Sequence, residues 1–182
     1  GDDALVAERV EAAVGGELDD GRPPEAQRHA RLLDRAAGLR AGIHPRLAQP
    51  AALVENSKLI DAPPHKTSVA EVVAQANDFD LVVAHTSVPA FASDVKVIEA
   101  MKDANPNLKA GLIGAKVAVK AEGALRDAPV IDFVARNEFD FTIKDVADGL
   151  SWKDIKGISY RTKDDVLHHN LDRPILENMD SL

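Results

Sequence analysis

The feature that most constrains the fold is an alternation of short apolar runs and helical stretches between Asp80 and Thr142. The apolar runs cover residues 81–84, 109–113 and 131–134, and each ends in small or polar residues. Two stretches with apolar residues at helical spacing separate these runs. Strands that alternate with helices predict a parallel sheet with helices packed on its faces. The sequence therefore predicts an α/β domain.

In sheets of this kind, ligands bind beyond the carboxyl ends of the strands. A small-molecule site is therefore expected where the three runs end. Hydroxyl groups before a helix N-terminus favour an anion or an amide oxygen, and a glycine lets the backbone approach a ligand closely. The same residues also have ordinary structural explanations, as helix caps and strand ends. The residues at the strand ends are His85, Thr86 and Ser87, then Gly114, Ala115 and Lys116, then Arg136, Asn137 and Glu138.

Composition excludes several classes of function. The net charge of −8 argues against a nucleic-acid partner, because phosphate binding needs clustered basic residues. The absence of cysteine excludes disulfides, thiolate zinc sites, a cysteine nucleophile and a cysteine-bound iron–sulfur cluster. No apolar run approaches the ~20 residues of a membrane span. The N-terminus lacks the pattern of a signal peptide, so a cytoplasmic location is expected.

Motifs for common cofactors are absent. The sequence contains neither G-x-G-x-x-G nor G-x-x-x-x-G-K-[ST], which argues against a dinucleotide site and against the common NTPase. His65 and His85 both follow predicted strands, but no carboxylates accompany them in register, so no metal site is predicted. His168 and His169 are expected on opposite faces of a hairpin strand and are therefore poor joint ligands.

Residues 1–46 differ from the remainder. They contain seven Arg and no Lys, whereas residues 47–182 contain eleven Lys and four Arg. Helices are predicted over residues 4–14 and 25–39, separated by glycine and proline breaks. One interpretation is an atypical helical or partly disordered extension. The alternative is a segment of different origin, for instance a shifted reading frame.

The remainder carries clear local signals. Residues 47–55 predict a short helix, and residues 57–62 a strand. Ser68 and Glu71 have the spacing of a capping box that begins a helix, and Asn105-Pro106-Asn107 is the stop signal of the following helix. Asn137 is expected to cap a last helix with Phe139, Ile143, Val146 and Leu150 on its core face. Residues 157–161 and 166–170 predict a β-hairpin, and residues 171–182 have no evident partner for their apolar side chains, as in a linker.

Residues 47–182 resemble a known family through several blocks in order. The blocks are LAQPAALVENSKLIDAPPH, DFDLVVAHTSVPAFASDVKVIEAMKDANPNLKAGLIGAKVAV, IDFVARNEFDFTI, IKGISYR and LDRPILENMDSL. They look like the N-terminal cobalamin-binding domain of cobalamin-dependent radical SAM enzymes. Within that superfamily the chain is most similar to the hopanoid-biosynthesis-associated radical SAM protein of bacteria.

The resemblance implies a flavodoxin-like (Rossmann-like) parallel sheet that holds cobalamin between strand-end loops. Residues 47–150 would form the cobalamin-binding domain, and residues 151–182 the lead-in to a radical SAM barrel outside this chain. That barrel would bind S-adenosylmethionine and a 4Fe-4S cluster through a C-x3-C-x2-C motif, and a hopanoid would be the substrate of the full-length relative. The cobalamin-binding residues implied are Thr86, Ser87, Gly114, Ala115, Lys116, Asn137 and Glu138.

Three departures from the family pattern matter. The chain contains no cluster motif, so it is not expected to be catalytic alone. It lacks D-x-H-x-x-G, so no protein histidine is expected below the cobalt. Nothing in residues 1–46 resembles the family's first strand and its Asn-Pro-Pro loop, which predicts a weakened or rearranged sheet and an incomplete site. The alternative is a non-catalytic interaction or scaffold domain that has this fold and binds no cofactor.

Overall fold

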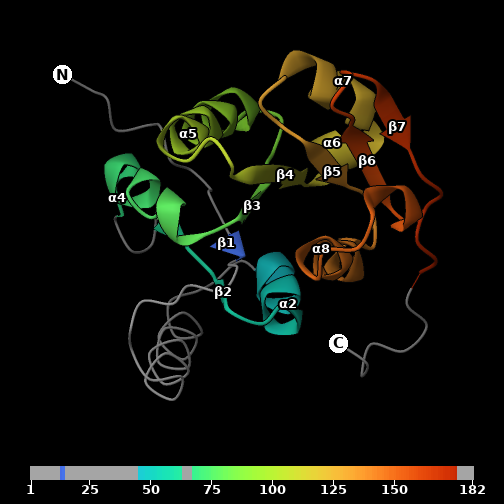
Figure 1. The fold of residues 1–182 in the computed structure, drawn as a ribbon, viewed down its shortest axis with the longest axis horizontal. Helices are drawn as coiled ribbons and strands as arrows, with labels where there is room; N and C mark the ends of the chain where they lie inside the picture. The colour runs from blue at the N-terminus through green and yellow to red at the C-terminus, as the bar shows by residue number, and fades with distance from the viewer. Residues whose placement is uncertain (1–12, 15–44, 63–66, 176–182) are drawn as a thin grey trace.

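The computed structural model describes residues 13–14, 45–62 and 67–175 (Figure 1). Its described part has one mixed sheet in the order β2-β1-β3-β4-β5-β6-β7, with helices on both faces. The predicted α/β fold is therefore confirmed. The strands are β1 Ala13–Val14, β2 Ser57–Lys58, β3 Leu81–His85, β4 Lys109–Ile113, β5 Phe133–Ala135, β6 Ile158–Arg161 and β7 Leu167–His169. The helices are α2 Pro45–Leu53, α4 Val69–Val73, α5 Phe91–Ala104, α6 Ala115–Val119, α7 Ala121–Asp127 and α8 Phe139–Ala147, with 3-10 turns η1 Ala76–Asp78 and η2 Trp152–Asp154.

Strands β3, β4 and β5 form the parallel centre of the sheet. Every residue of β3 is buried, and its side chains alternate between the two faces. Val82 and Ala84 belong to one apolar cluster, whereas Leu81 and Val83 belong to the other. This alternation follows from the two-residue period of a strand. The apolar run is continuous because both faces are covered.

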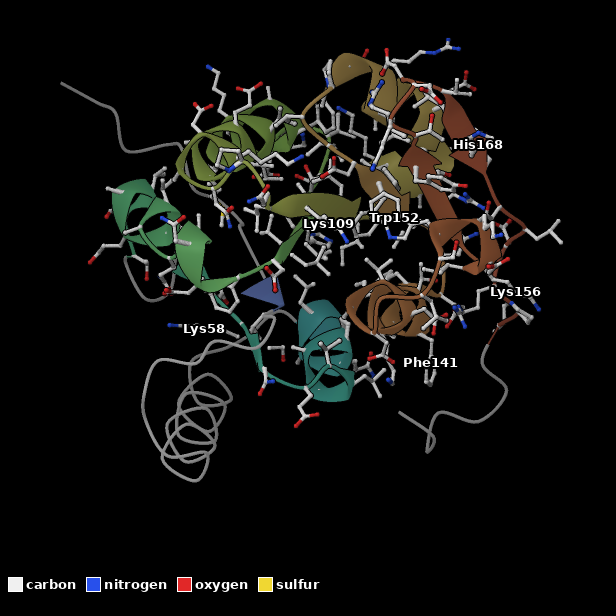
Figure 2. The ribbon with its side chains drawn as sticks, in the orientation of Figure 1. Lys58, Lys109, Phe141, Trp152, Lys156 and His168 are labelled. Carbon is white, nitrogen blue, oxygen red and sulfur yellow. The ribbon has the colours of Figure 1, made fainter. Side chains whose placement is uncertain are left out.

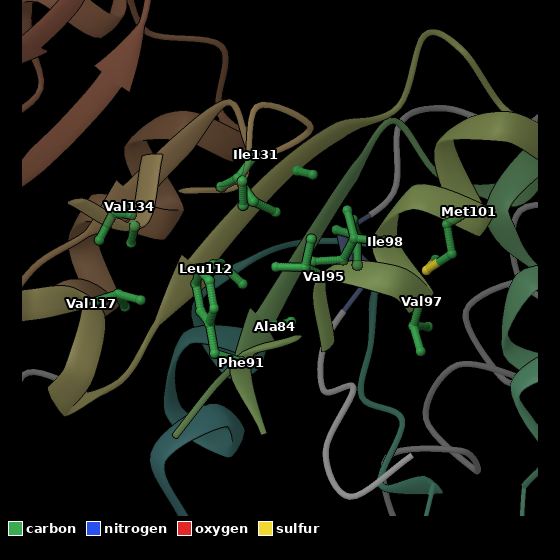
Figure 3. Close-up of a cluster of buried hydrophobic side chains, with 14 of the residues drawn as sticks. Ala84, Phe91, Val95, Val97, Ile98, Met101, Leu112, Val117, Ile131 and Val134 are labelled. Carbon is green, nitrogen blue, oxygen red and sulfur yellow. The ribbon is translucent and has the colours of Figure 1, made fainter. Parts of the chain in front are cut away.

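The two clusters lie on opposite faces of the sheet. One cluster packs the strands against α4, α5, α6 and α7, and its buried members include Leu125 of α7. Ile98, Met101 and Val117 of the same cluster are seen in Figure 3. The other packs them against α2 and α8 (Figure 1). Each face thus buries apolar surface, which is the main stabilising contribution to a layered domain.

The sheet is not uniformly parallel. Ala13 and Val14 form β1 between β2 and β3 and run antiparallel to both. These two residues are strand, although the end of a helix was predicted there; the rest of both helices predicted within residues 1–46 lies outside the described residues. Strand β2 pairs over only two residues, because its neighbour β1 is that short. A short antiparallel strand therefore lies beside β3.

The predicted hairpin is confirmed and continues the same sheet. Strand β6 pairs antiparallel with β5 and then with β7. The turn is closed by the Thr162 amide, which donates to the Val166 carbonyl over 2.9 Å. Asp165 has a φ of 62°, a left-handed conformation that Asp tolerates better than most residues. The hairpin thereby covers the edge that β5 would otherwise leave unpaired.

Helix ends agree with the sequence signals in two cases and differ in two. The Ser68 and Glu71 capping box is present, with Glu71 accepting from the Ser68 amide over 2.7 Å. Helix α5 ends at a cap formed by Asn105, as predicted. Helix α6 was not predicted, since its sequence AKVAV continues an apolar run. Leu150 is 46% exposed rather than part of the core face, because α8 ends at Ala147.

Candidate functional site

The parallel strands place the three predicted strand-end segments along one edge of the sheet. His85, the last residue of β3, is in register with Ile113, the last residue of β4. The Thr86 amide continues this ladder and donates to the Ile113 carbonyl over 2.9 Å. Strand β5 is the next neighbour of β4 in the same direction. We call the segments loop A (residues 85–87), loop B (residues 114–116) and loop C (residues 136–138).

Loops A and B are in direct contact. Gly114 has a φ of 124° and a ψ of 161°, which is a conformation that essentially only glycine adopts. A Cβ atom at this position would lie 2.1 Å from the Thr86 carbonyl oxygen. Gly114 is therefore required by the close approach of the two loops. The exposed Ala115 follows it and begins α6.

The hydroxyl residues of loop A differ in their exposure. Thr86 is 1% exposed, and its hydroxyl lies 3.4 Å from the Ser87 carbonyl. Ser87 is half-buried, and its carbonyl accepts from the Phe91 amide over 3.0 Å at the start of α5. Thr86 thus contributes backbone packing, and Ser87 is the residue of this pair that is partly accessible. His85 is 6% exposed and ends the strand, where a loop position was predicted.

Lys116 joins loop B to the helix that follows loop A. Its ammonium nitrogen lies 3.5 Å from the centroid of the Phe91 ring, which is a cation–π contact. Phe91 is buried at the start of α5, beside Leu112 (Figure 3). The lysine is half-buried, so its positive charge is held at this edge of the sheet.

Loop C turns through a left-handed residue. Asn137 has a φ of 51° and is exposed, and its carbonyl accepts from the Phe139 amide over 3.0 Å. Glu138 occupies the N-cap position of α8, and no side-chain cap bond is formed there. The prediction that Asn137 caps this helix is therefore wrong. An amide side chain at Asn137 and a half-buried carboxylate at Glu138 remain at the strand-end edge.

Asp140 is a titratable residue beside loop C that the sequence analysis did not identify. Burial, and secondarily the Glu138 charge, raises the pKa of Asp140 from 3.8 to about 6. Its Oδ1 atom is buried and has no hydrogen-bond partner in the described part of the chain. The only signal in the sequence is the pair of acids two residues apart in NEFD, which is common in helix starts and so does not distinguish a site.

Arg136 is directed into the protein instead of toward a ligand. It is 9% exposed, and its Nη1 donates to the Ile158 carbonyl over 2.9 Å and to the Ser159 hydroxyl. Its Nη2 donates to the Asn170 carbonyl and, over 2.8 Å, to Asp172. The residues of loops A, B and C that are at least partly exposed, and so available to a ligand, are Ser87, Ala115, Lys116, Asn137 and Glu138.

The other histidines of the described residues, His168 (Figure 2) and His169, lie in β7, the last strand of the sheet. His65 lies outside the described residues. His168 stacks on Tyr160, with ring centroids 5.4 Å apart, whereas the His169 ring nitrogen lies 2.8 Å from the Ser159 hydroxyl. Since Ser159 and Tyr160 face opposite sides of β6, the prediction that this histidine pair is divided between two faces is confirmed. Within residues 13–14, 45–62 and 67–175, no helix has the length and apolarity to cross a membrane.

Sequence comparison with known proteins finds a partial match to one curated protein. No protein-family model matches the chain. An uncharacterized methyltransferase of Pyrococcus horikoshii is 30% identical over 109 residues, which is 58% of this chain and 24% of the relative. The chain thus spans about a quarter of the length of that relative.

The fold also resembles two structures of the cobalamin-dependent S-adenosylmethionine radical enzyme OxsB. One has aqua-cobalamin bound, and the other has aqua-cobalamin and S-adenosylmethionine bound. In both cases the TM-score is 0.54 at 15% sequence identity, over 65% of this chain and 17% of the enzyme. At this identity the likeness establishes the Rossmann-like fold of the sheet and its helices.

Proposed function

We propose that this chain is the cobalamin-binding module of a cytoplasmic radical SAM enzyme of hopanoid side-chain biosynthesis, and that it is not catalytic alone. The observation that carries the proposal is the contact of loops A and B at Gly114, beside loop C on the same edge of the parallel sheet. Ligands of α/β sheets bind at this edge. OxsB, which has the same fold over most of this chain, binds cobalamin.

The residues present fit a ligand of this chemistry. Cobalamin carries many carboxamide groups, which both donate and accept hydrogen bonds. The hydroxyl of Ser87, the amide of Asn137 and the carboxylate of Glu138 are complementary to such groups. Ala115 is exposed and has a small side chain, so a flat ligand can approach loop B closely at this residue.

The chain would hold the cofactor without a histidine below the cobalt. His85 is buried in the end of β3, so its ring is not presented at the strand-end edge. Bound cobalamin would supply the cobalt centre, and the residues of this chain would bind and orient it. S-adenosylmethionine and a 4Fe-4S cluster would belong to a barrel that residues 151–182 lead toward. The likeness to a methyltransferase agrees with cobalamin-linked chemistry in the larger protein.

A titration with hydroxocobalamin tests the proposal. The purified chain is mixed with hydroxocobalamin and passed through a gel-filtration column, with visible absorbance recorded across the eluted protein. Co-elution with a spectrum shifted toward the base-off form is expected. The variant Ala115→Phe adds a ring to loop B and should abolish co-elution. Ala104→Phe adds the same ring at an exposed position at the other end of α5 and should leave binding unchanged.

A second candidate is a non-catalytic interaction or scaffold domain. It is favoured by the direction of β1, whose last residue, Val14, is in register with Leu81 at the start of β3. The carboxyl end of β1 therefore lies at the edge opposite to loops A, B and C. Hydroxocobalamin that elutes apart from a chain folded by circular dichroism would select this candidate over the first.

A further inference from the structure

The chain exit, residues 170–173, is bound firmly to the end of β5. Asp172 Oδ1 accepts from Arg136 Nε over 3.1 Å and from Arg136 Nη2 over 2.8 Å. The same guanidinium donates to the Asn170 carbonyl and to two groups of β6. Arg136 thus uses all three nitrogens, and its planar fork has a defined orientation. It also directly precedes Asn137 and Glu138 of loop C.

Backbone hydrogen bonds connect the same two segments through Gly157. The Arg136 amide donates to the Gly157 carbonyl over 2.8 Å, and the Gly157 amide donates to the Leu171 carbonyl over 2.8 Å. Asn170 adds side-chain bonds of 2.7 Å to the carbonyls of Trp152 and Ile155. Gly157 therefore lies between the end of β5 and the chain exit and is hydrogen-bonded to both.

A second arginine attaches the exit to α8. Arg173 Nε donates to the Thr142 hydroxyl over 3.2 Å, and Arg173 Nη2 pairs with Asp145. Thr142 is fully buried and donates to the Lys156 carbonyl over 2.8 Å. Leu171 and Ile175 are 81% and 80% exposed, so within residues 171–175 the prediction that the apolar side chains of this segment lack partners is confirmed. Polar groups anchor the segment on both sides.

We propose that Arg136 is a positioning residue that, with Asp172, holds loop C and the chain exit as one rigid unit. Binding of a ligand by Asn137 and Glu138 is thereby coupled to the direction in which the chain leaves the sheet after Arg173. A coupling of this kind orients a domain that follows the exit relative to a ligand at loop C. The coupling to ligand binding rests on the proposed function, whereas the rigid attachment of the exit does not.

Asp172 is the residue to replace, because its side chain is 63% exposed and its loss need not unfold the domain. Ala at this position removes the acceptor, while Asn keeps an oxygen for the guanidinium. The matched control is Asp165→Ala, which breaks the pair between Arg161 and Asp165 at the exposed hairpin turn. All three variants should keep the thermal midpoint of the parent within about 4 °C.

Motion of the exit is read by a spin label at Ile175→Cys. This position is 80% exposed, and the label attaches uniquely because the chain has no other cysteine. In electron paramagnetic resonance spectra, Asp172→Ala should convert a restricted label into a mobile one. Asp172→Asn should retain most of the restriction, and Asp165→Ala should leave the spectrum unchanged. A label that is equally mobile in the parent and in Asp172→Ala, or that Asp165→Ala mobilises as much, overturns the rigid unit.

Hydroxocobalamin binding to the same unlabelled variants tests the coupling. Asp172→Ala should weaken binding by about fivefold, the low end of typical coupling between sites, with binding restored by Asp172→Asn and unaffected by Asp165→Ala. Equal affinity of the parent and Asp172→Ala overturns the coupling. If the parent itself does not bind hydroxocobalamin, the proposed cofactor fails, and the spin-label result still decides whether Arg136 and Asp172 fix the exit.

Discussion

Replacement of Gly114 by alanine should destabilise the domain more than the same replacement at Gly123 or Gly149. Two effects combine at this position. The backbone has φ 124° and ψ 161°, a region that costs a residue with a side chain of the order of 1–3 kcal/mol. The new Cβ atom would also lie 2.1 Å from the Thr86 carbonyl oxygen, which is backbone and cannot rotate away.

Relief of that contact requires loops A and B to separate. Such a movement would strain the hydrogen bond from the Thr86 amide to the Ile113 carbonyl, now 2.9 Å long. A buried donor left without its acceptor costs about 1–3 kcal/mol. Together the two effects predict a loss of about 2–6 kcal/mol in the free energy of unfolding. That is a large part of the roughly 5–15 kcal/mol that stabilises a typical domain.

Two other glycines separate the two effects. Gly149 has a φ of 80° and open space around its Cβ position, so Gly149→Ala should cost only about 1–2 kcal/mol for the left-handed backbone. Gly123 lies within α7, and its Cβ position has a single neighbour at 4.0 Å, so Gly123→Ala should stabilise by about 0.5–1 kcal/mol.

Urea unfolding followed by far-ultraviolet circular dichroism measures all three variants. The expected order of stability is Gly123→Ala, parent, Gly149→Ala, Gly114→Ala. A Gly114→Ala variant within about 0.5 kcal/mol of Gly149→Ala would refute the reasoning, because the close approach of loops A and B would then contribute nothing beyond backbone strain. The Gly114→Ala variant should also fail to co-elute with hydroxocobalamin in the gel-filtration assay.

Three further predictions concern other parts of the domain. Burial chiefly raises the pKa of Asp140 from 3.8 to about 6, so the folded state favours the protonated form of this residue. The stability that this preference contributes is fully present below about pH 4 and is lost as the pH rises through 6. Urea midpoints should therefore be higher for Asp140→Asn than for the parent at pH 7.5 and equal at pH 3.5, and a difference that grows on acidification would contradict this sign. Gly111→Ala should destabilise by about 1–3 kcal/mol, because its Cβ would lie 2.2 Å from the Phe133 ring, and Phe133→Leu in the same chain should recover part of the loss in thermal melts. Asp132→Ala should destabilise by about 1–3 kcal/mol by leaving the Ala110 amide, now 2.7 Å from the carboxylate, without an acceptor, whereas Asp132→Asn, which keeps one, should show less than half of that effect in urea melts.

The elements that the sequence predicted correctly depend on local signals. The buried runs that became β3 and β4, the capping box at Ser68 and the stop at Asn105 each involve residues close in the chain. Such signals act through backbone conformation and hydrogen bonds that do not depend on distant segments. The hairpin of β6 and β7 was predictable for the same reason.

The elements that were missed depend on distant partners. Helix α6 follows β4 without a change in apolar pattern, and its N-cap residue, Gly114, turns the chain where it meets loop A. The direction of β1 is set by pairing with β2 and β3, which are more than 40 residues away, and two residues carry too little pattern to predict it.

The candidate site shows the same division. The positions of loops A, B and C followed from the rule that parallel strands end at one edge, which needs only the order of the runs. The roles of individual residues did not follow. Arg136 stood beside Asn137 in the sequence as an equal candidate, yet its partner Asp172 is 36 residues away. Asp140 acquires its raised pKa from burial, which no local pattern reports.

The sequence by itself thus determined an α/β domain, the common edge of the three strand-end segments and the exclusion of cysteine chemistry. These conclusions rest on periodicity and composition, which a chain carries before it folds. Only the tertiary structure decided that Thr86 and Gly114 touch, that Lys116 lies over Phe91 and that Arg136 holds the chain exit. Those contacts join residues far apart in the chain. Their geometry depends on how the helices and strands pack together, and local sequence patterns do not predict that packing.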